Sequence, residues 1–387
     1  MKRTNYMEMI GILSLSLLIT SPMTVSGSLP QILEEFSEYP RAMVENLMSI
    51  PSFPIMIIIA LTPFLLKHIK EKTMVVTGLF FIGVAGVIPF FVTSFPVIFA
   101  SRIGLGIGIG LVNTLAVSLI GERYTGDLRQ RLQGIRCSME TLGEATLFFI
   151  AGQLLAFGWK APFLVYGLAL IILFIYIFFV PETENRREQN AQPEERKEKR
   201  KISPKSWSLI IKNALLGGLI VSTMTANALR LSTYLVETSL GTATEGSTIL
   251  SISIYAGFFG GFLFGFLANR LQKLLFPVSA ILTAVGLFGI VSTESLVVIT
   301  IAASVCGMFM TIILSHMFNS LSDQFPAEDL NTANAIVLVG CNVGSFVTPF
   351  FLSIVGIINP SLHMGFLAYG VVYLILGVAA LAKNIKK

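Results

Sequence analysis

The sequence predicts an all-α membrane protein whose twelve transmembrane helices form two pseudo-symmetric six-helix bundles. Hydrophobic residues make up 54% of the 387-residue chain and charged residues only 13%, whereas roughly 25% of the residues in a soluble domain are charged. A membrane-spanning helix needs about 20 apolar residues and must pair all of its backbone groups internally. With short loops between them, about twelve such helices fit this chain.

One long polar run divides the apolar chain into two halves of similar length. Between Glu182 and Lys201 it carries seven Lys or Arg and six Glu residues. A run this charged buries too little apolar surface to fold alone, so we expect a solvated linker; an exposed charged helix is the alternative. The chain is therefore divided into an N-terminal bundle (1–181), a charged linker (182–206) and a C-terminal bundle (207–387).

The first predicted span, residues 7–29, follows a basic start and ends near Pro30. A secretory signal peptide begins in a similar way, but the many later spans favour a retained helix. The second span contains Pro51, Pro54 and Pro63, so we expect it to bend. Apolar runs predict spans 2 to 12 at residues 46–66, 73–93, 97–121, 132–157, 161–180, 208–235, 246–268, 274–293, 295–319, 332–357 and 362–382.

The distribution of Lys and Arg predicts the orientation, because these residues favour the cytoplasmic side of a membrane. With the N-terminus inside, the predicted outer loops hold only Arg41 and Lys160. The inner segments hold nearly all the other basic residues, although the loop 324–331 has none. We expect a multi-pass protein of the cytoplasmic (inner) membrane with both termini and the linker in the cytoplasm.

The fourth span carries the motif RIGLGIGIG from Arg102 to Gly110. The motif resembles the R-x-x-x-G-x-G pattern of the major facilitator superfamily, especially its twelve-helix drug:proton antiporter (multidrug efflux) branch. The two halves also echo each other, with Leu142-Gly143 matching Val343-Gly344, as in transporters built from repeats. The resemblance covers essentially the whole chain. It implies the major facilitator fold, a cavity lined by spans 1, 4, 7 and 10, and a role for the arginine in proton coupling.

The sequence departs from that family at two motifs. After span 2, Pro63, Lys67 and His68 stand where the family has Gly, Asp and Arg. In span 5, Leu147 and Phe148 stand where the antiporter motif has Gly-Pro. These departures concern gating charges and drug antiport and leave the expected fold unchanged.

Three ionisable residues lie inside span 5, namely Arg136, Glu140 and Glu144. Each costs on the order of 3 kcal/mol in the membrane, so each needs a partner or a polar cavity. Their spacing of four places them on one helical face, where Arg136 can pair with Glu140. Glu144 is left near mid-membrane, and a desolvated carboxyl readily accepts a proton. We predict that Glu144, with Glu140, couples transport to protons, with Glu144 binding a cationic substrate or nothing when ionised; a structural pair is the alternative.

Arg102 is the third predicted proton-coupling residue. It lies about 8 Å inside the outer end of span 4, and Glu144 lies about 20 Å inside span 5, at a rise of about 1.5 Å per residue. This axial gap predicts no direct pair between them. Arg102 is expected to bond carbonyls of span 1 or to approach the acid in only one state; snorkelling to the outer interface is the alternative.

The glycines of span 4 are predicted to pack helices. Gly104, Gly106, Gly108 and Gly110 lie inside a span and do not match the nucleotide-binding G-x-G-x-x-G spacing. They form two overlapping G-x-x-x-G steps, which allow close helix contact. Smooth surfaces for sliding helices are the second interpretation.

Six more residues are predicted to line a substrate cavity. Packing is the alternative for the methionine and the histidine. The six are Met23, Asn113, Asn227, Tyr255, His316 and Asn342.

Several functions are excluded by motif. The sequence has no G-K-[ST], H-E-x-x-H or G-x-S-x-G motif, so we expect neither an ATP-driven pump nor another enzyme. Cys137, Cys306 and Cys341 fall in apolar segments without paired spacing, which predicts packing and neither disulfides nor a metal site. No cofactor is expected. The net charge of +5 lies beside the membrane, so no nucleic acid partner is expected.

These observations predict a secondary active transporter that exports small amphipathic or drug-like solutes by alternating access, with proton antiport. Its expected partners are a small-molecule substrate, protons and the lipid bilayer, and a monomer suffices. The first alternative is a major facilitator transporter of a specific metabolite, such as a sugar, amino acid or nucleoside. The second is a non-transporting membrane sensor or assembly protein.

Overall fold

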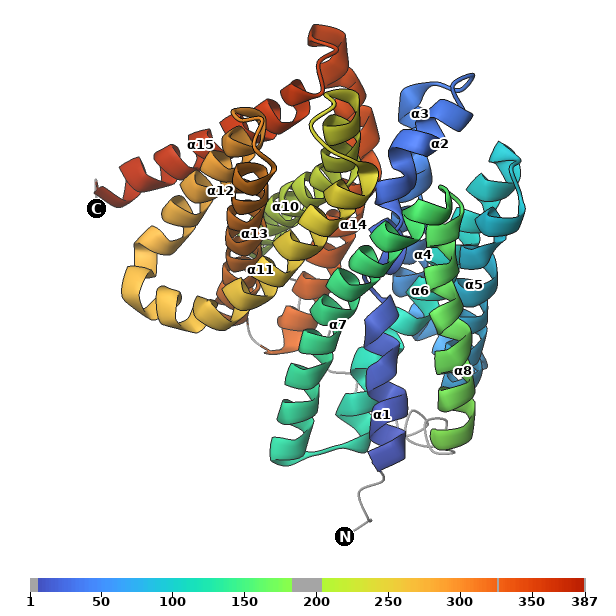
Figure 1. Ribbon diagram of the computed structural model, residues 1–387. Helices are drawn as coiled ribbons and strands as arrows, with labels where there is room; N and C mark the ends of the chain where they lie inside the picture. The colour runs from blue at the N-terminus through green and yellow to red at the C-terminus, as the bar shows by residue number, and fades with distance from the viewer. Residues whose placement is uncertain (1–5, 183–203, 326, 386–387) are drawn as a thin grey trace.

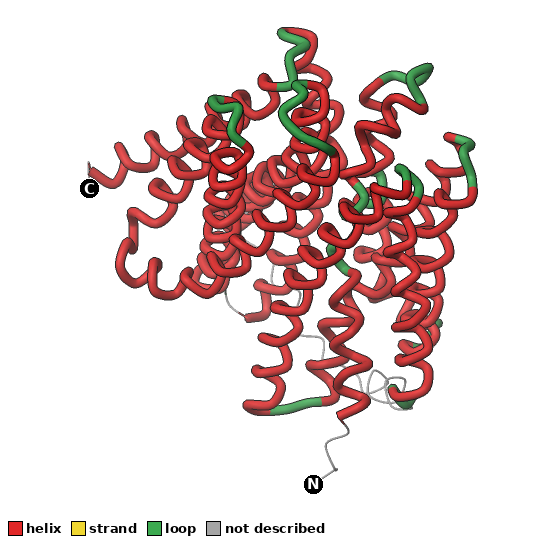
Figure 2. The backbone as a smooth tube through the Cα atoms, in the orientation of Figure 1, coloured by secondary structure: helices red, strands yellow, loops and turns green. Residues whose placement is uncertain are grey.

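The computed structural model describes residues 6–182, 204–325 and 327–385, which are helical apart from short connections and contain no strand (Figures 1 and 2). Fourteen α-helices follow one another along these residues, and each overlaps a predicted span. In the N-terminal half the helices are α1 (Tyr6–Ser14), α2 (Leu29–Glu35), α3 (Arg41–Ser49), α4 (Ser52–His68), α5 (Glu71–Phe91), α6 (Phe95–Arg123), α7 (Gly126–Leu154) and α8 (Leu168–Phe179). In the C-terminal half they are α10 (Pro204–Glu237), α11 (Ala243–Leu271), α12 (Leu275–Val291), α13 (Leu296–Gln324), α14 (Ala327–Ile358) and α15 (His363–Ile385).

Length and hydropathy alone identify nine membrane-spanning stretches in the described residues, or ten if the bent pair at the N-terminus counts as one span. One of the nine joins α11 and α12, and α7 is not among them. The absence of α7 follows from its sequence, because Arg136, Glu140 and Glu144 lower its hydropathy. An all-helical membrane fold is therefore confirmed, and its least apolar span is the one that carries the charges.

The first span differs from the single helix predicted at 7–29. It bends by 48°, and three short 3-10 turns connect α1 to α2 between residues 15 and 28. Pro30, where the helix was predicted to end, lies instead in the first turn of α2, a position that tolerates a missing N–H. The second span breaks before Pro51, between α3 and α4, in keeping with the predicted bend.

The two halves meet through α7 against α11 and through α3 and α4 against α14. We call the end that bears α2, α3 and the α10–α11 and α14–α15 connections the closed end (Figure 1). There, Gly27 and Gly152 both lie directly against Ser247 of α11. Among the described residues, the sequence positions of the side-chain hydrogen bonds and ion pairs between the halves fall either at this end or near the middle of the helices. We call the opposite end, near the N-terminus, the N-terminal end.

The predicted linker lies almost entirely outside the described residues. Its first residue, Glu182, pairs with Lys70 at 2.9 Å. Helix α10 already begins at Pro204, two residues before the predicted end of the linker. The proposed boundary between the halves therefore remains a prediction from composition.

The four glycines of α6 contact two different helices. A Cβ at Gly106 would lie 2.4 Å from the Pro51 carbonyl oxygen, on the side of α4. A Cβ at Gly108 would lie 2.6 Å from the Gly78 carbonyl oxygen of α5, and Gly104 also faces α5. Gly110 lies against Ile58 of α4. The two interleaved glycine steps thus let α6 pack tightly between α4 and α5, and this contact places Asn113 one turn further along the helix.

We expect Gly108→Ala to lower the thermal stability of the purified protein by about 1–3 kcal/mol, because the added methyl overlaps backbone atoms of α5. Gly134→Ala in α7 is the matched control, since a Cβ there meets nothing within 4 Å. Melting in detergent measures both. Equal melting temperatures for the two variants would contradict the packing role of Gly108.

Candidate functional site

A central cavity of about 430 Å³ lies between the two halves of the molecule. Eight spans contribute to it, namely the first, second, fourth, fifth, seventh, eighth, tenth and eleventh. The resemblance implied only spans 1, 4, 7 and 10. Spans 3, 6, 9 and 12, which are α5, α8, α12 and α15, supply no lining residue. The cavity therefore lies along the contact between the halves, and the other four spans support it from outside.

Six of the nine residues predicted for coupling or for the cavity line this space. They are Met23, Asn113, Glu140, Glu144, Asn227 and Asn342. Tyr255 is not among the lining residues, and its hydroxyl instead lies 3.0 Å from the Thr146 hydroxyl, across the α7–α11 contact. His316 lies farther along α13, beyond the lining residues of that helix.

The α7 carboxylates have different surroundings. Arg136 pairs with Glu140 at 2.8 Å and donates a second bond to the Gln133 side-chain oxygen at 3.1 Å. Glu144, one turn further, has no ion-pair partner among the described residues. Its side chain has a hydrogen-bond partner in the Thr20 hydroxyl, which also lies 3.3 Å from the Glu140 carbonyl oxygen. The cavity thus contains one neutralised carboxylate and one unpaired carboxyl.

The broken first span places Thr20 beside these acids. A Cβ at Gly143 of α7 would lie 2.8 Å from the Leu17 Cα atom, so the two backbones are in close contact. The 3-10 turns on either side of Thr20 then present residues 19, 20, 22 and 23 to the cavity. Sequence analysis missed Thr20, because a straight helix at 7–29 gives no reason to single it out.

Arg102 lies outside the cavity and is completely buried. Its guanidinium donates to the Pro22 carbonyl oxygen, to the Leu47 carbonyl oxygen at 2.9 Å and to the Tyr166 hydroxyl at 3.0 Å. It also lies within 6.0 Å of the Phe163 and Tyr166 ring centroids. The structure therefore favours the predicted bond to span 1 carbonyls over snorkelling, and no contact joins Arg102 to Glu144. Since Pro22 lines the cavity, Arg102 supports the cavity wall from behind.

We expect Arg102→Met to destabilise the protein by about 1–3 kcal/mol, because the buried Leu47 carbonyl oxygen loses the Arg102 donor and the Pro22 carbonyl oxygen keeps only the longer bond from the Tyr166 hydroxyl, at 3.4 Å. Arg270→Met, at an exposed position of α11, is the control and should change stability by less than about 0.5 kcal/mol. Thermal melting distinguishes the two. If both variants have the same melting temperature, the bonds of Arg102 do not stabilise the break in span 1.

Three hydroxyl groups form a hydrogen-bonded cluster at the cavity wall, and one of its two bonds joins the halves. Ser52 of α4 donates to Ser345 of α14 at 3.0 Å, and Thr225 of α10 donates to the same oxygen at 3.0 Å. All three residues line the cavity. Sequence analysis did not identify them, because single serines and threonines are common in membrane helices and carry no motif.

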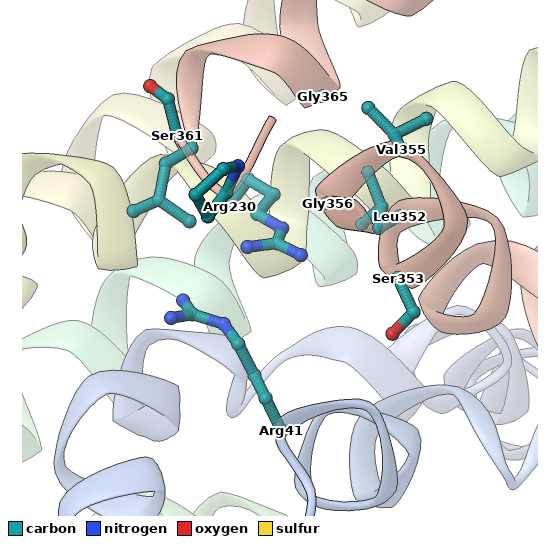
Figure 3. A pocket seen from close by; sticks show the side chains of 10 residues that line it. Arg41, Arg230, Leu352, Ser353, Val355, Gly356, Ser361 and Gly365 are labelled. Carbon is teal, nitrogen blue, oxygen red and sulfur yellow. The ribbon is translucent and has the colours of Figure 1, made fainter. Parts of the chain in front are cut away.

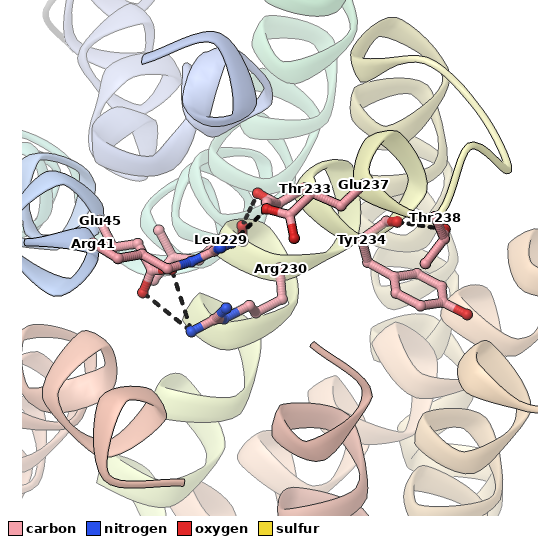
Figure 4. Close-up of polar contacts among 8 residues, drawn as sticks. All are labelled: Arg41, Glu45, Leu229, Arg230, Thr233, Tyr234, Glu237 and Thr238. Atoms are coloured by element: carbon pink, nitrogen blue, oxygen red, sulfur yellow. Dashed lines mark hydrogen bonds and ion pairs between the residues drawn. The ribbon is translucent and has the colours of Figure 1, made fainter. Parts of the chain in front are cut away.

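A buried charge network connects the halves at the closed end (Figure 4). Glu45 of α3 is 1% exposed and binds Arg41 at 2.9 Å and Arg230 of α10 at 3.2 Å. Arg41 also pairs with Glu237 at 3.0 Å. The four-residue spacing of Arg41 and Glu45 is visible in the sequence, but their pairing with Arg230 depends on the contact between the halves.

Comparison with known proteins agrees with this architecture. The family model described as Major Facilitator Superfamily matches residues 11–237 and 216–384. A search of curated proteins found no match. Similar solved structures include the xylose transporter XylE from E. coli (14% identity, 96% of this chain and 95% of that chain covered, TM-score 0.70). A second is the nucleoside transporter NupG, as a D323A mutant, at 14% identity, with 98% of this chain and 99% of that chain covered and a TM-score of 0.72. A third is a POT family transporter in complex with 5-aminolevulinic acid, at 11% identity, with 98% of this chain and 96% of that chain covered and a TM-score of 0.73.

Proposed function

Because the chain belongs to the major facilitator superfamily, we propose that it is a secondary active transporter that exports small amphipathic or drug-like solutes in exchange for protons. The observation that carries this proposal is the position of Glu144. It is a carboxyl without an ion-pair partner among the described residues, and it lines the cavity between the halves. An ionisable group at this depth is costly, so one that has no partner indicates a functional site.

The proposed mechanism is alternating access, in which the two halves rock about the central cavity. In the orientation predicted from Lys and Arg, the closed end faces outward, so the charge network seals this conformation on the outer side. Ionised Glu144 accepts the positive charge of a substrate, or faces water. A proton at Glu144 removes that charge and allows the cavity to close, because a neutral acid tolerates a dry environment better.

The neighbours of Glu144 fit this role. Arg136 pairs with Glu140, which leaves Glu144 as the cavity carboxyl without a cation among the described residues and therefore as the proposed proton acceptor. Thr20 can donate to the ionised carboxylate and accept from the protonated one, because a hydroxyl does both. Met23, Met224 and Met310 add adaptable apolar surface to the same cavity, which suits amphipathic solutes of varied shape.

A specific metabolite is the second candidate substrate, and the lining residues favour it in one respect. Amide groups from Asn113, Asn227 and Asn342 line the same cavity, as do the three clustered hydroxyl groups. The Asn227 side-chain oxygen is buried and has no partner among the described residues, as expected for a group that binds a polar solute. A sugar, amino acid or nucleoside would use such groups.

We expect Glu144→Gln to abolish proton-coupled transport while the protein still inserts into the membrane. The measurement is accumulation of a panel of dyes and antibiotics in an efflux-deficient bacterium, with and without a protonophore. Cells with the native protein should accumulate less of at least one compound until the protonophore is added. The variant should accumulate as much as cells without the protein.

Glu35→Gln, an exposed acid at the closed end, is the control and should transport normally. Native coupling in Glu144→Gln would overturn the role of this carboxyl. If the native protein changes the accumulation of no lipophilic compound, the metabolite candidate takes its place.

A further inference from the structure

A second, smaller cavity lies at the closed end, apart from the central one (Figure 3). Its volume is about 210 Å³, below the roughly 300–1,000 Å³ of a typical small-molecule site. Its walls come from Arg41 of α3, Arg230 of α10, the end of α14 and the beginning of α15. It shares no residue with the central cavity.

The charge of this cavity is unusual. Two of its lining residues are arginines and none is acidic. Figure 3 shows the two guanidinium groups facing one another across the space. The carboxylates that pair with them lie outside the lining: Glu45 is shared by both arginines, and Glu237 pairs with Arg41 at 3.0 Å.

Arg230 has unused bonding capacity. Its side chain is 10% exposed, and it binds Glu45 through only one terminal nitrogen, Nη2. Its Nε atom is buried and has no hydrogen-bond partner among the described residues. Buried donors are normally satisfied, and a guanidinium offers five N–H donors with a geometry suited to anions.

The remaining lining groups suit a small anion. Ser353 supplies a hydroxyl group, and Gly356 leaves space, because a Cβ there would meet nothing within 4 Å. The Ser361 hydroxyl also lines the cavity but is bonded to the His363 ring nitrogen at 2.7 Å. A cavity of this size exceeds the roughly 30 Å³ occupied by one water molecule in the liquid, so a small ion and a few waters fit. We propose that this cavity binds a small monovalent anion, either chloride or a short carboxylate, between Arg41 and Arg230.

Such an anion would act on the conformation of the transporter. Arg41 belongs to the N-terminal half and Arg230 to the C-terminal half, so an ion held by both joins the halves at the closed end. A ligand that binds only one state stabilises that state. The anion therefore favours the conformation in which the closed end is sealed, independently of the substrate and the proton.

The test is thermal melting of the purified full-length protein in sodium chloride, sodium acetate and sodium gluconate at matched ionic strength. Chloride and acetate distinguish an inorganic ion from a carboxylate, and gluconate is the bulkier reference. We expect a saturable rise in melting temperature of roughly 2 °C or more in chloride, acetate or both, relative to gluconate.

Two variants remove the site in different ways. Arg230→Gln removes one guanidinium. Gly356→Leu fills the cavity but keeps every charge, and a side chain has room to begin there because a Cβ meets nothing within 4 Å. Arg270→Gln, exposed on α11, is the charge-matched control.

The rise should disappear in Arg230→Gln and Gly356→Leu and persist in Arg270→Gln. If Arg230→Gln does not fold, Gly356→Leu decides the question alone. The proposal is overturned if gluconate stabilises the native protein as much as the smaller anions do. It is equally overturned if the rise persists in Gly356→Leu.

Discussion

An ionisable side chain inside an apolar membrane helix must be paired or must face a polar cavity, and α7 meets this requirement over successive turns. Arg136 and Glu140 pair with each other, and Glu144 lines the cavity. The need of Glu144 for a polar environment explains why α7 lies at the contact with α11 and not at the lipid-facing periphery. The spans that supply no cavity residue also hold no comparable charge series. The position of the cavity therefore follows from where the chain places its charges.

The broken first span connects the cavity to the buried arginine behind it. Arg102 binds the Pro22 carbonyl oxygen, and two residues earlier Thr20 lies against Glu140 and Glu144. Arg102 and Glu144 thus act on the same short segment without touching each other. Such an arrangement allows the arginine of span 4 to influence the acid of span 5 through the backbone position of this segment alone. The irregular backbone lets the segment contact both residues.

Much of the fold could be predicted from the sequence, because apolar length and the distribution of basic residues are local signals. The pair Arg136–Glu140 and the axial gap between Arg102 and Glu144 followed from helical spacing. The break in span 1 could not be predicted, because its turns are held by Arg102 and by the Gly143–Leu17 contact, which are distant in sequence. The same reason applies to Glu45 with Arg230 and to the hydroxyl groups of Ser52 and Ser345, each of which needs both halves in place.

The central claim is that one carboxyl, at Glu144, gains and loses a proton inside the cavity. The most direct measurement is infrared difference spectroscopy of the carboxyl C=O stretch as the pH is changed, on the native protein and on Glu140→Gln and Glu144→Gln variants. The account predicts a protonated-carboxyl band that titrates in the native protein, persists in Glu140→Gln and is absent from Glu144→Gln. A band that remains unchanged in Glu144→Gln would contradict it.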